Sequence, residues 1–251
     1  MYWPKKARRL SLPKCSADTM GVYRALPEPE YRDLASRILY EDNHLLIFNK
    51  RTGEIVQGDK TGDEPLSETL KAFIAQRDGK PGQVFMGVPH RLDRPVSGVC
   101  VFAKTSKALE RLNDMLRNGE IHKTYWALTA NRPPQGSDIL TDFLVRNEAQ
   151  NKSYVAKNGK EARLKYTLLQ TTERYFLLEV ELYTGRHHQI RCQLAHMGCP
   201  IKGDLKYGAK RSNPDGGISL MARRIQFIHP VKKTEVDVLA PVPDSWKGIQ
   251  G

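Results

Sequence analysis

Apolar positions along the chain follow two different periods, and their succession predicts a mixed set of strands and helices. Two β-prone runs flank Asp42-Asn43 within residues 38–50, which is the pattern of a β-hairpin, and a turn is expected at 50–53. The strand over 176–182 has alternating apolar residues, and we expect it to pair with 162–169. The other strands are predicted at 99–103, 122–129, 219–228 and 235–239.

Apolar residues at helical spacing predict three helices, at 65–77, 106–117 and 187–197. We expect Pro65 in the first turn of the first helix and Ser106 as the N-cap of the second. Gly198 is expected to end the third helix. One short helical turn is expected at 30–36.

The order of these elements predicts an α+β fold, in which a largely antiparallel mixed sheet is flanked by helices and loops. The pattern contains no internal repeat and no second hydrophobic core, so we expect one domain over 36–245. Residues 1–35 hold scattered prolines and basic residues without a clear period. This composition predicts a poorly ordered basic N-terminal arm.

The composition of the 251 residues excludes several classes of protein. No apolar run approaches the roughly 18 residues of a membrane span, and the first residues do not form a secretory signal. The four cysteines contain no Cys-x-x-Cys pair, so we expect reduced thiols in a cytoplasmic protein. They are Cys15, Cys100, Cys192 and Cys199.

The formal net charge of +12 is concentrated in two segments. Residues 1–17 carry +5 and residues 186–233 carry +8, so the rest of the chain sums to −1. Positive charge gathered in this way favours a polyanionic partner, of which nucleic acid is the commonest.

The first candidate for chemistry is the turn that holds Asp93 between Arg91 and Arg94. Apolar neighbours raise the pKa of an aspartate, whereas a nearby guanidinium lowers it. A carboxylate kept ionised in a partly dry loop can act as a nucleophile or a base. The alternative is an aspartate that only stabilises the turn or pairs with an arginine.

The second candidate is the segment 183–194, where a strand ends at a glycine and a helix begins. Helix N-termini bind phosphate. Arg186 and Arg191 are five residues apart and so lie on different sides of the helix, one toward nucleic acid and one toward a site. His188 and His196 are eight apart and lack the spacing of paired metal ligands, so we expect no metal; capping, hydrogen bonding or phosphate contact is favoured for His188.

These segments resemble the motifs of the RluA-type family of RNA pseudouridine synthases. The core of the resemblance is His90-Arg91-Leu92-Asp93 followed by Ser97-Gly98. Further matches in the same order are Lys50-x-x-Gly53, Lys123-Thr124-Tyr125-Trp126-Ala127, Thr184-Gly185-Arg186-x-His188-Gln189-Ile190-Arg191, Gly203-Asp204 with Tyr207-Gly208, and Phe227-x-His229-Pro230. Arg51 and Val96 depart from the family's usual Pro and Thr, which bears on loop stiffness or target choice.

The resemblance implies an isomerase that converts a uridine in RNA into pseudouridine without a cofactor or metal, with 36–245 as its catalytic domain. Asp93 matches the catalytic aspartate, and its role stays open between attack on the ribose, attack on the base and action as a base. Arg191 matches the arginine that pairs with this aspartate, and Tyr125 matches the tyrosine that stacks on the target base. The target must be flipped out of its stack.

The resemblance also implies a set of RNA contacts. Arg91 would fill the space that the flipped base leaves, and Ile190 and Leu194 would form walls of the pocket. Phosphate contacts are expected from Arg94, Arg186, Lys202, Lys206 and Lys210, with His188 as a further RNA contact.

Two questions remain open at the level of sequence. The family modifies both ribosomal and transfer RNA, and one sequence does not select the target; a monomer is the default. The alternative function is a non-catalytic RNA-binding module in ribosome assembly.

About 35 residues precede the catalytic region, too few for the S4 RNA-binding domain that is frequent in the family, so we expect the basic arm to substitute for it in part.

Overall fold

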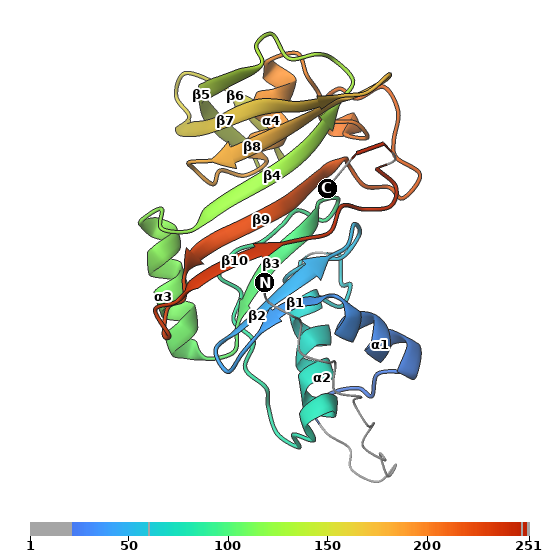
Figure 1. Cartoon of the computed structure of the whole chain (residues 1–251), viewed down its shortest axis with the longest axis vertical. Helices are drawn as coiled ribbons and strands as arrows, with labels where there is room; N and C mark the ends of the chain where they lie inside the picture. The colour runs from blue at the N-terminus through green and yellow to red at the C-terminus, as the bar shows by residue number, and fades with distance from the viewer. Residues whose placement is uncertain (1–21, 60, 247, 250–251) are drawn as a thin grey trace, which may run out of the picture.

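The computed structural model describes residues 22–59, 61–246 and 248–249, and within them one ten-stranded sheet runs the length of the molecule (Figure 1). The strand order is β1-β2-β3-β9-β4-β8-β7-β5-β6, and β10 pairs with β9. Only β3 and β9 are parallel among these pairs, so the predicted α+β fold with a largely antiparallel mixed sheet is confirmed. The strands are β1 Ile38–Glu41, β2 Leu45–Lys50, β3 Ser97–Ala103, β4 His122–Thr129, β5 Ser137–Asn147, β6 Lys152–Val155, β7 Lys160–Thr171, β8 Phe176–Leu182, β9 Leu220–Ile228 and β10 Glu235–Leu239.

The described residues also form four helices, which lie at the two ends and one side of this sheet (Figure 1). They are α1 Glu28–Ser36, α2 Leu66–Asp78, α3 Ser106–Arg117 and α4 Gln189–His196, and a 3₁₀ turn, η1, spans Leu205–Tyr207. The first two pack beside β1 and β2 at one end, and α4 packs against β5 and β6 at the other. The central strands β3, β9 and β4 therefore join the two halves of the molecule.

Two expectations about helix starts are wrong in detail. Thr105, rather than Ser106, caps α3, because the Thr105 hydroxyl accepts a hydrogen bond from the backbone N–H of Ala108 at 3.2 Å. Pro65 occupies the N-cap position of α2 instead of its first turn.

The helix α1 corrects the prediction of a poorly ordered arm for the part of the arm that the structure describes. It begins at Glu28, and Tyr31 and Leu34 are buried in the main core. Their apolar contact with the core stabilises a helix that is longer than the single helical turn expected at 30–36. Residues 1–21 of the predicted arm, including Cys15, lie outside the described residues.

Strands β5 and β6 are absent from the prediction. Most side chains of β5 are exposed or half-buried. The strand therefore lacks the alternation of apolar and polar residues that indicates one buried face. Its position comes from backbone pairing with β7, which runs from Ser137–Thr167 to Leu144–Lys160. A small second apolar cluster of Leu144, Ala162, Cys192 and Tyr207 also lies under α4, where no second core is predicted.

Gly98 brings the strands at the centre of the sheet unusually close together. It has a φ of +107°, and a Cβ at this position would lie 2.2 Å from the carbonyl oxygen of Ala222. In the register of the sheet, Ala222 faces Gly98 on one side and Tyr125 on the other. The loop before β3 is thereby held next to β4.

Candidate functional site

Asp93 lies in the loop that enters β3, with its side chain 35% exposed. Its Oδ2 atom is 3.4 Å from Nη1 of Arg191 and 3.4 Å from Nε2 of His188. His188 and Arg191 follow Asp93 by about a hundred residues in the sequence. The packing of α4 brings both side chains to the loop that holds Asp93. One carboxylate oxygen therefore faces basic groups while part of the side chain stays open to solvent.

The guanidinium of Arg191 is buried and forms its main ion pair with Asp204. Nε and Nη2 donate hydrogen bonds to the two carboxylate oxygens of Asp204 at 2.7 and 2.8 Å. Burial opposes the charge of Arg191, but the bond and attraction to Asp204 outweigh it and raise the arginine's pKa. The expected contact between Arg191 and Asp93 is present, but at 3.4 Å it is longer than the contacts with Asp204. The sequence did not identify Asp204 as the partner of Arg191, although Gly203-Asp204 is one of the matched motifs.

Tyr125 lies on β4 with 7% of its surface exposed. Burial raises the pKa of its phenol, and the negative charge of Asp93 raises it further. The phenol therefore stays protonated at neutral pH. The carboxylate of Asp93 is therefore near enough to influence the ionisation of the Tyr125 phenol.

His188 is buried inside the site, at the N-cap position of α4, and it forms the hydrogen bonds that are among the roles favoured for it in the sequence. It is 8% exposed, and its Nδ1 is 3.0 Å from the hydroxyl of Tyr207. Burial, followed by the positive charge of Arg191, lowers the pKa of His188 to about 2, so the imidazole is neutral. Its ring stacks on that of His187 at 3.8 Å.

Ile190 and Leu194 belong to the main hydrophobic core. Leu194 has no exposed surface and Ile190 is 5% exposed. We therefore assign Leu194 to packing in place of the predicted pocket wall, because a side chain without exposed surface offers nothing to a ligand.

Lys50 anchors the loop that carries Asp93, a role that the motif around Lys50 did not reveal. This fully buried side chain donates from Nζ to the carbonyl oxygens of Arg51, Asp93, Arg94 and Val96, at 3.0, 3.3, 3.2 and 2.6 Å. Burial without a carboxylate contact lowers its pKa to about 8. The sequence signals were the Lys50-x-x-Gly53 motif and the position of this lysine at the end of an apolar strand.

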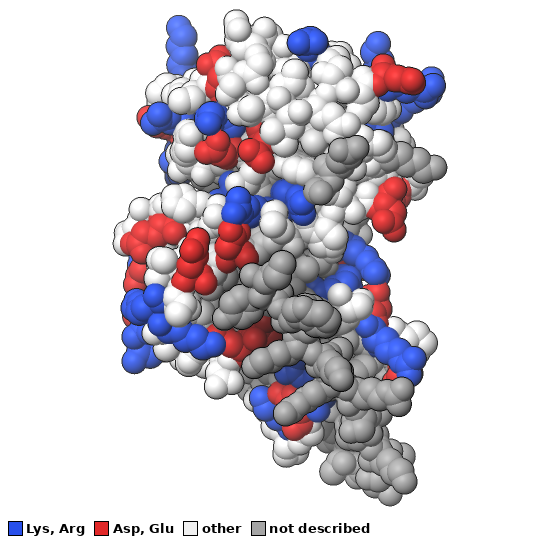
Figure 2. Space-filling view, in the orientation of Figure 1, with Lys and Arg blue, Asp and Glu red and all other residues white. Residues whose placement is uncertain are grey.

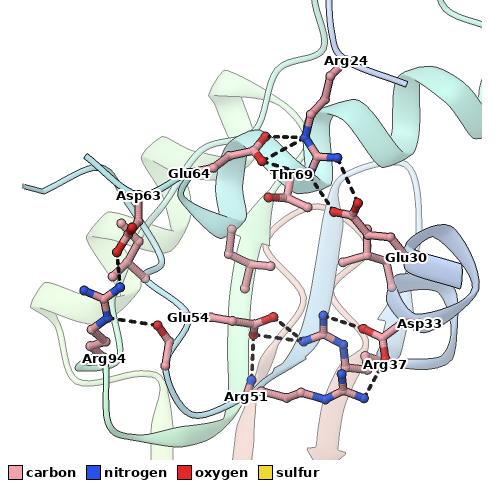
Figure 3. A pocket seen from close by; sticks show the side chains of 14 residues that line it. Arg24, Glu30, Asp33, Arg37, Arg51, Glu54, Asp63, Glu64, Thr69 and Arg94 are labelled. Carbon is pink, nitrogen blue, oxygen red and sulfur yellow. Dashed lines mark hydrogen bonds and ion pairs between the residues drawn. The ribbon is translucent and has the colours of Figure 1, made fainter. Parts of the chain in front are cut away.

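Arg94 lines a cavity of about 330 Å³ whose lining does not include Asp93 (Figure 3). Its Nη2 pairs with Asp63, and its Nε donates to the carbonyl oxygen of Gly53 at 3.1 Å. The other arginines of the cavity are also paired with carboxylates, so its walls carry no surplus positive charge. The charged lining residues are Arg24, Arg37, Arg51, Arg94, Glu30, Asp33, Glu54, Asp63 and Glu64.

A basic rim of Arg146, Arg186 and Lys206 lies near the two stacked histidines. The positive charges of Arg146 and Lys206 contribute to the lowered pKa of both His187 and His188, which places them close to the site. Arg186 donates to the carbonyl oxygen of Glu161 at 2.8 Å and is exposed. Arg146 was missed because it lies on the unpredicted strand β5.

The remaining predicted RNA contacts lie at the surface with few partners. Arg91 and Lys210 are exposed, and the Nζ of Lys202 lies 5.2 Å from the ring centroid of Tyr175. On the visible part of the face in Figure 2, basic and acidic side chains are interspersed. The positive charge located in the sequence therefore does not form one continuous patch on that face.

Two features are absent from the residues that the structure describes. Among them, no group of three or more His, Cys, Asp or Glu side chains is arranged to hold a metal ion. None of the described helices has the length and apolar character that crossing a membrane requires.

Comparison with known proteins identifies the family. The family described as RNA pseudouridylate synthase matches residues 44–196. Ribosomal large subunit pseudouridine synthase D of Xylella fastidiosa is 33% identical over 230 residues, covering 85% of this chain and 68% of that protein. Ribosomal large subunit pseudouridine synthase C of Vibrio cholerae is 32% identical over 216 residues, covering 84% and 67%.

Solved structures agree on the fold. Human RNA Pseudouridylate Synthase Domain Containing 4 superposes with a TM-score of 0.72 at 23% identity, covering 86% of this chain and 92% of that one. Human RNA Pseudouridylate Synthase Domain Containing 1 gives a TM-score of 0.65 at 20% identity, covering 82% and 83%. The resemblance to the RluA-type enzymes is confirmed: the chain belongs to the RNA pseudouridylate synthase family and is an isomerase that acts on RNA.

Proposed function

We propose that the target is a uridine in structured ribosomal RNA and that Asp93 is the group that acts on it, as nucleophile or base. The observation that carries the assignment is the placement of this carboxylate, with one oxygen against Arg191 and His188 and a third of the side chain exposed. The printed names of the relatives from Xylella fastidiosa and Vibrio cholerae, which specify the ribosomal large subunit, favour ribosomal RNA.

Arg191 would keep Asp93 ionised and aimed, since a nearby cation favours the carboxylate form. Tyr125 would stack on the target base, and its protonated phenol is suited to pass a proton at the end of the reaction. Because a base within a helix cannot reach Asp93, the target nucleotide must be flipped out, at a cost of a few kcal/mol.

Phosphate contacts would come from the basic rim, together with Lys202 and Lys210. Affinity that depends on such contacts falls steeply with salt. Arg91, exposed beside Asp93, would occupy the space of the flipped base.

The substitution Asp93→Asn tests the role of this carboxylate with little change of shape. We expect turnover of a ribosomal RNA fragment to be abolished while RNA affinity stays near the wild-type value. Product formation near the wild-type rate would reject Asp93. If the wild-type chain binds RNA but forms no pseudouridine in any RNA, the alternative of a non-catalytic assembly module is favoured.

The target itself is tested by mapping pseudouridine across ribosomal and transfer RNAs of cells with and without the gene. Loss of one position in large-subunit RNA, restored by the wild-type gene and not by Asp93→Asn, is the expected result. A position lost only from transfer RNA would overturn the ribosomal assignment and leave the role of Asp93 intact.

A further inference from the structure

The proton arrangement around His188 is determined by its two neighbours. Nη1 of Arg191 is 3.0 Å from Nε2 of His188, and a guanidinium can only donate hydrogen bonds. Nε2 must therefore accept, which places the imidazole proton on Nδ1, where it is donated to the hydroxyl oxygen of Tyr207 at 3.0 Å. That oxygen also accepts from the backbone N–H of Ser153 at 2.8 Å.

This tautomer leaves His188 without a proton to donate to Asp93. The 3.4 Å approach of Nε2 to Oδ2 of Asp93 is bridged instead by Nη1 of Arg191, whose two protons serve the imidazole and the carboxylate. The neutral state of the ring supports this arrangement, because burial and the charge of Arg191 oppose its protonation. His188 therefore acts on the site through the guanidinium.

The backbone of His188 adopts an unfavourable conformation to reach this position. Its φ is +52°, which residues with a Cβ rarely adopt, and it is the N-cap of α4. The ring is held between the stacked ring of His187 at 3.8 Å and the edge of Tyr207 at 5.7 Å. Strained conformations that the surroundings enforce cluster at functional sites.

We infer that His188, oriented by Tyr207, is a positioning residue that directs Nη1 of Arg191 toward Asp93. Asp204 holds the opposite edge of the guanidinium through Nε and Nη2. Asp204 alone leaves the group able to pivot about that edge, so the acceptor on His188 sets the direction in which Nη1 points. This inference rests on the proposed role of Asp93, and it gives His188 a different task from the predicted contact with RNA.

Two substitutions at His188 separate positioning from backbone strain. A Gln amide group can take the place of Nε2, whereas an Asn amide group reaches only the place of Nδ1. Asn, however, tolerates a positive φ better than Gln. Positioning therefore predicts that His188→Gln retains more activity than His188→Asn, and a role in the backbone alone predicts the reverse.

The measurement is the single-turnover rate constant at saturating enzyme on a ribosomal RNA fragment, with the dissociation constant measured in parallel. We expect His188→Asn to lower the rate constant about 100-fold and His188→Gln less than about 10-fold, as for a small misplacement of a catalytic group. Because His188 is buried, RNA affinity should change less than about twofold. His196→Asn is the matched control, since this histidine lies on the same helix with its side chain 59% exposed, and it should leave the rate unchanged.

A third variant keeps the inference testable if both substitutions at His188 unfold the chain. Tyr207→Phe retains the ring and removes the acceptor for Nδ1, so we expect a loss of about 10-fold in rate with unchanged affinity. A wild-type rate for Tyr207→Phe, or higher activity in His188→Asn than in His188→Gln, would overturn the inference. Full activity in Asp93→Asn would instead overturn the proposed function, which separates the two failures.

Discussion

Arg191 and Asp204 form a bidentate ion pair in which the side chains are 6% and 1% exposed, with N–O distances of 2.7 and 2.8 Å. Asp204 therefore balances the charge of the buried arginine. Asp93 contacts only the remaining nitrogen, Nη1, at 3.4 Å. Because Arg191 does not enclose Asp93, part of the Asp93 side chain stays exposed and open to a substrate.

Removing one charge of this pair should be costly. Asp204→Asn leaves a buried guanidinium with a neutral partner, and breaking such a pair costs about 3–5 kcal/mol. We expect the free energy of unfolding, measured by denaturant titration, to fall by about 3 kcal/mol or more. Asp237→Asn is the control, because the pair of Arg224 and Asp237 is 40% and 32% exposed and should lose about 1 kcal/mol at most. Equal losses in the two variants would contradict the importance of burial.

Gly98→Ala should disrupt the centre of the sheet. The new Cβ would lie 2.2 Å from the carbonyl oxygen of Ala222, on a backbone with a φ of +107°. We expect a loss of about 4 kcal/mol or more in the free energy of unfolding. Gly119→Ala isolates the backbone effect, since Gly119 also has a positive φ of +73° but no atoms within 4 Å of the added carbon. It should lose about 1–2 kcal/mol; a similar loss at both positions would show that the strands can separate.

Lys50 should make stability depend on pH in the alkaline range. Burial lowers its pKa from 10.5 to about 8, so between these values the unfolded chain binds more protons than the folded one at this residue. The free energy of unfolding contributed by Lys50 therefore rises as the pH increases from 8 to 10.5. At lower pH the folded chain has to keep a buried ammonium charged.

The comparison with Lys50→Met isolates this effect from the other titrating groups. From pH 7.5 to 10.5, the stability of the wild type relative to the variant should increase by on the order of 3 kcal/mol. Denaturant titrations at several pH values provide the measurement. A difference that stays constant over this range would mean that Lys50 titrates at its ordinary pKa.

Asp63→Asn should strengthen RNA binding if Arg94 contacts phosphate. In the wild-type chain the carboxylate of Asp63 forms an ion pair with the guanidinium of Arg94 and so competes with a phosphate. We expect a tighter dissociation constant at low salt, and a slope of log affinity against log salt that is steeper by about 0.7–0.9, the value for one further phosphate contact. Asp114→Asn on α3 removes the same charge from another exposed pair, with Arg117. An equal change in that control would attribute the effect to net charge alone.

Local sequence patterns determined much of the fold and the identity of the central residues. The hairpin over 38–50, the helix that begins near Pro65 and the strand at 122–129 follow from spacing that short-range contacts enforce. Asp93, Tyr125 and Arg191 were named from motifs alone. Strand β5 was not predicted, because its largely exposed side chains show no alternation of buried and exposed positions. Its position depends on pairing with β7.

Only the tertiary structure decided which groups meet. Asp204 is 13 residues from its partner Arg191, and Lys50 contacts carbonyl groups 43 to 46 residues away. The sequence shows the charges of these residues, but partner choice depends on how α4, η1 and the loop before β3 pack around the sheet. Because a buried charge must find its partners within the fold, Arg191 links Asp204, His188 and Asp93 in one internal network.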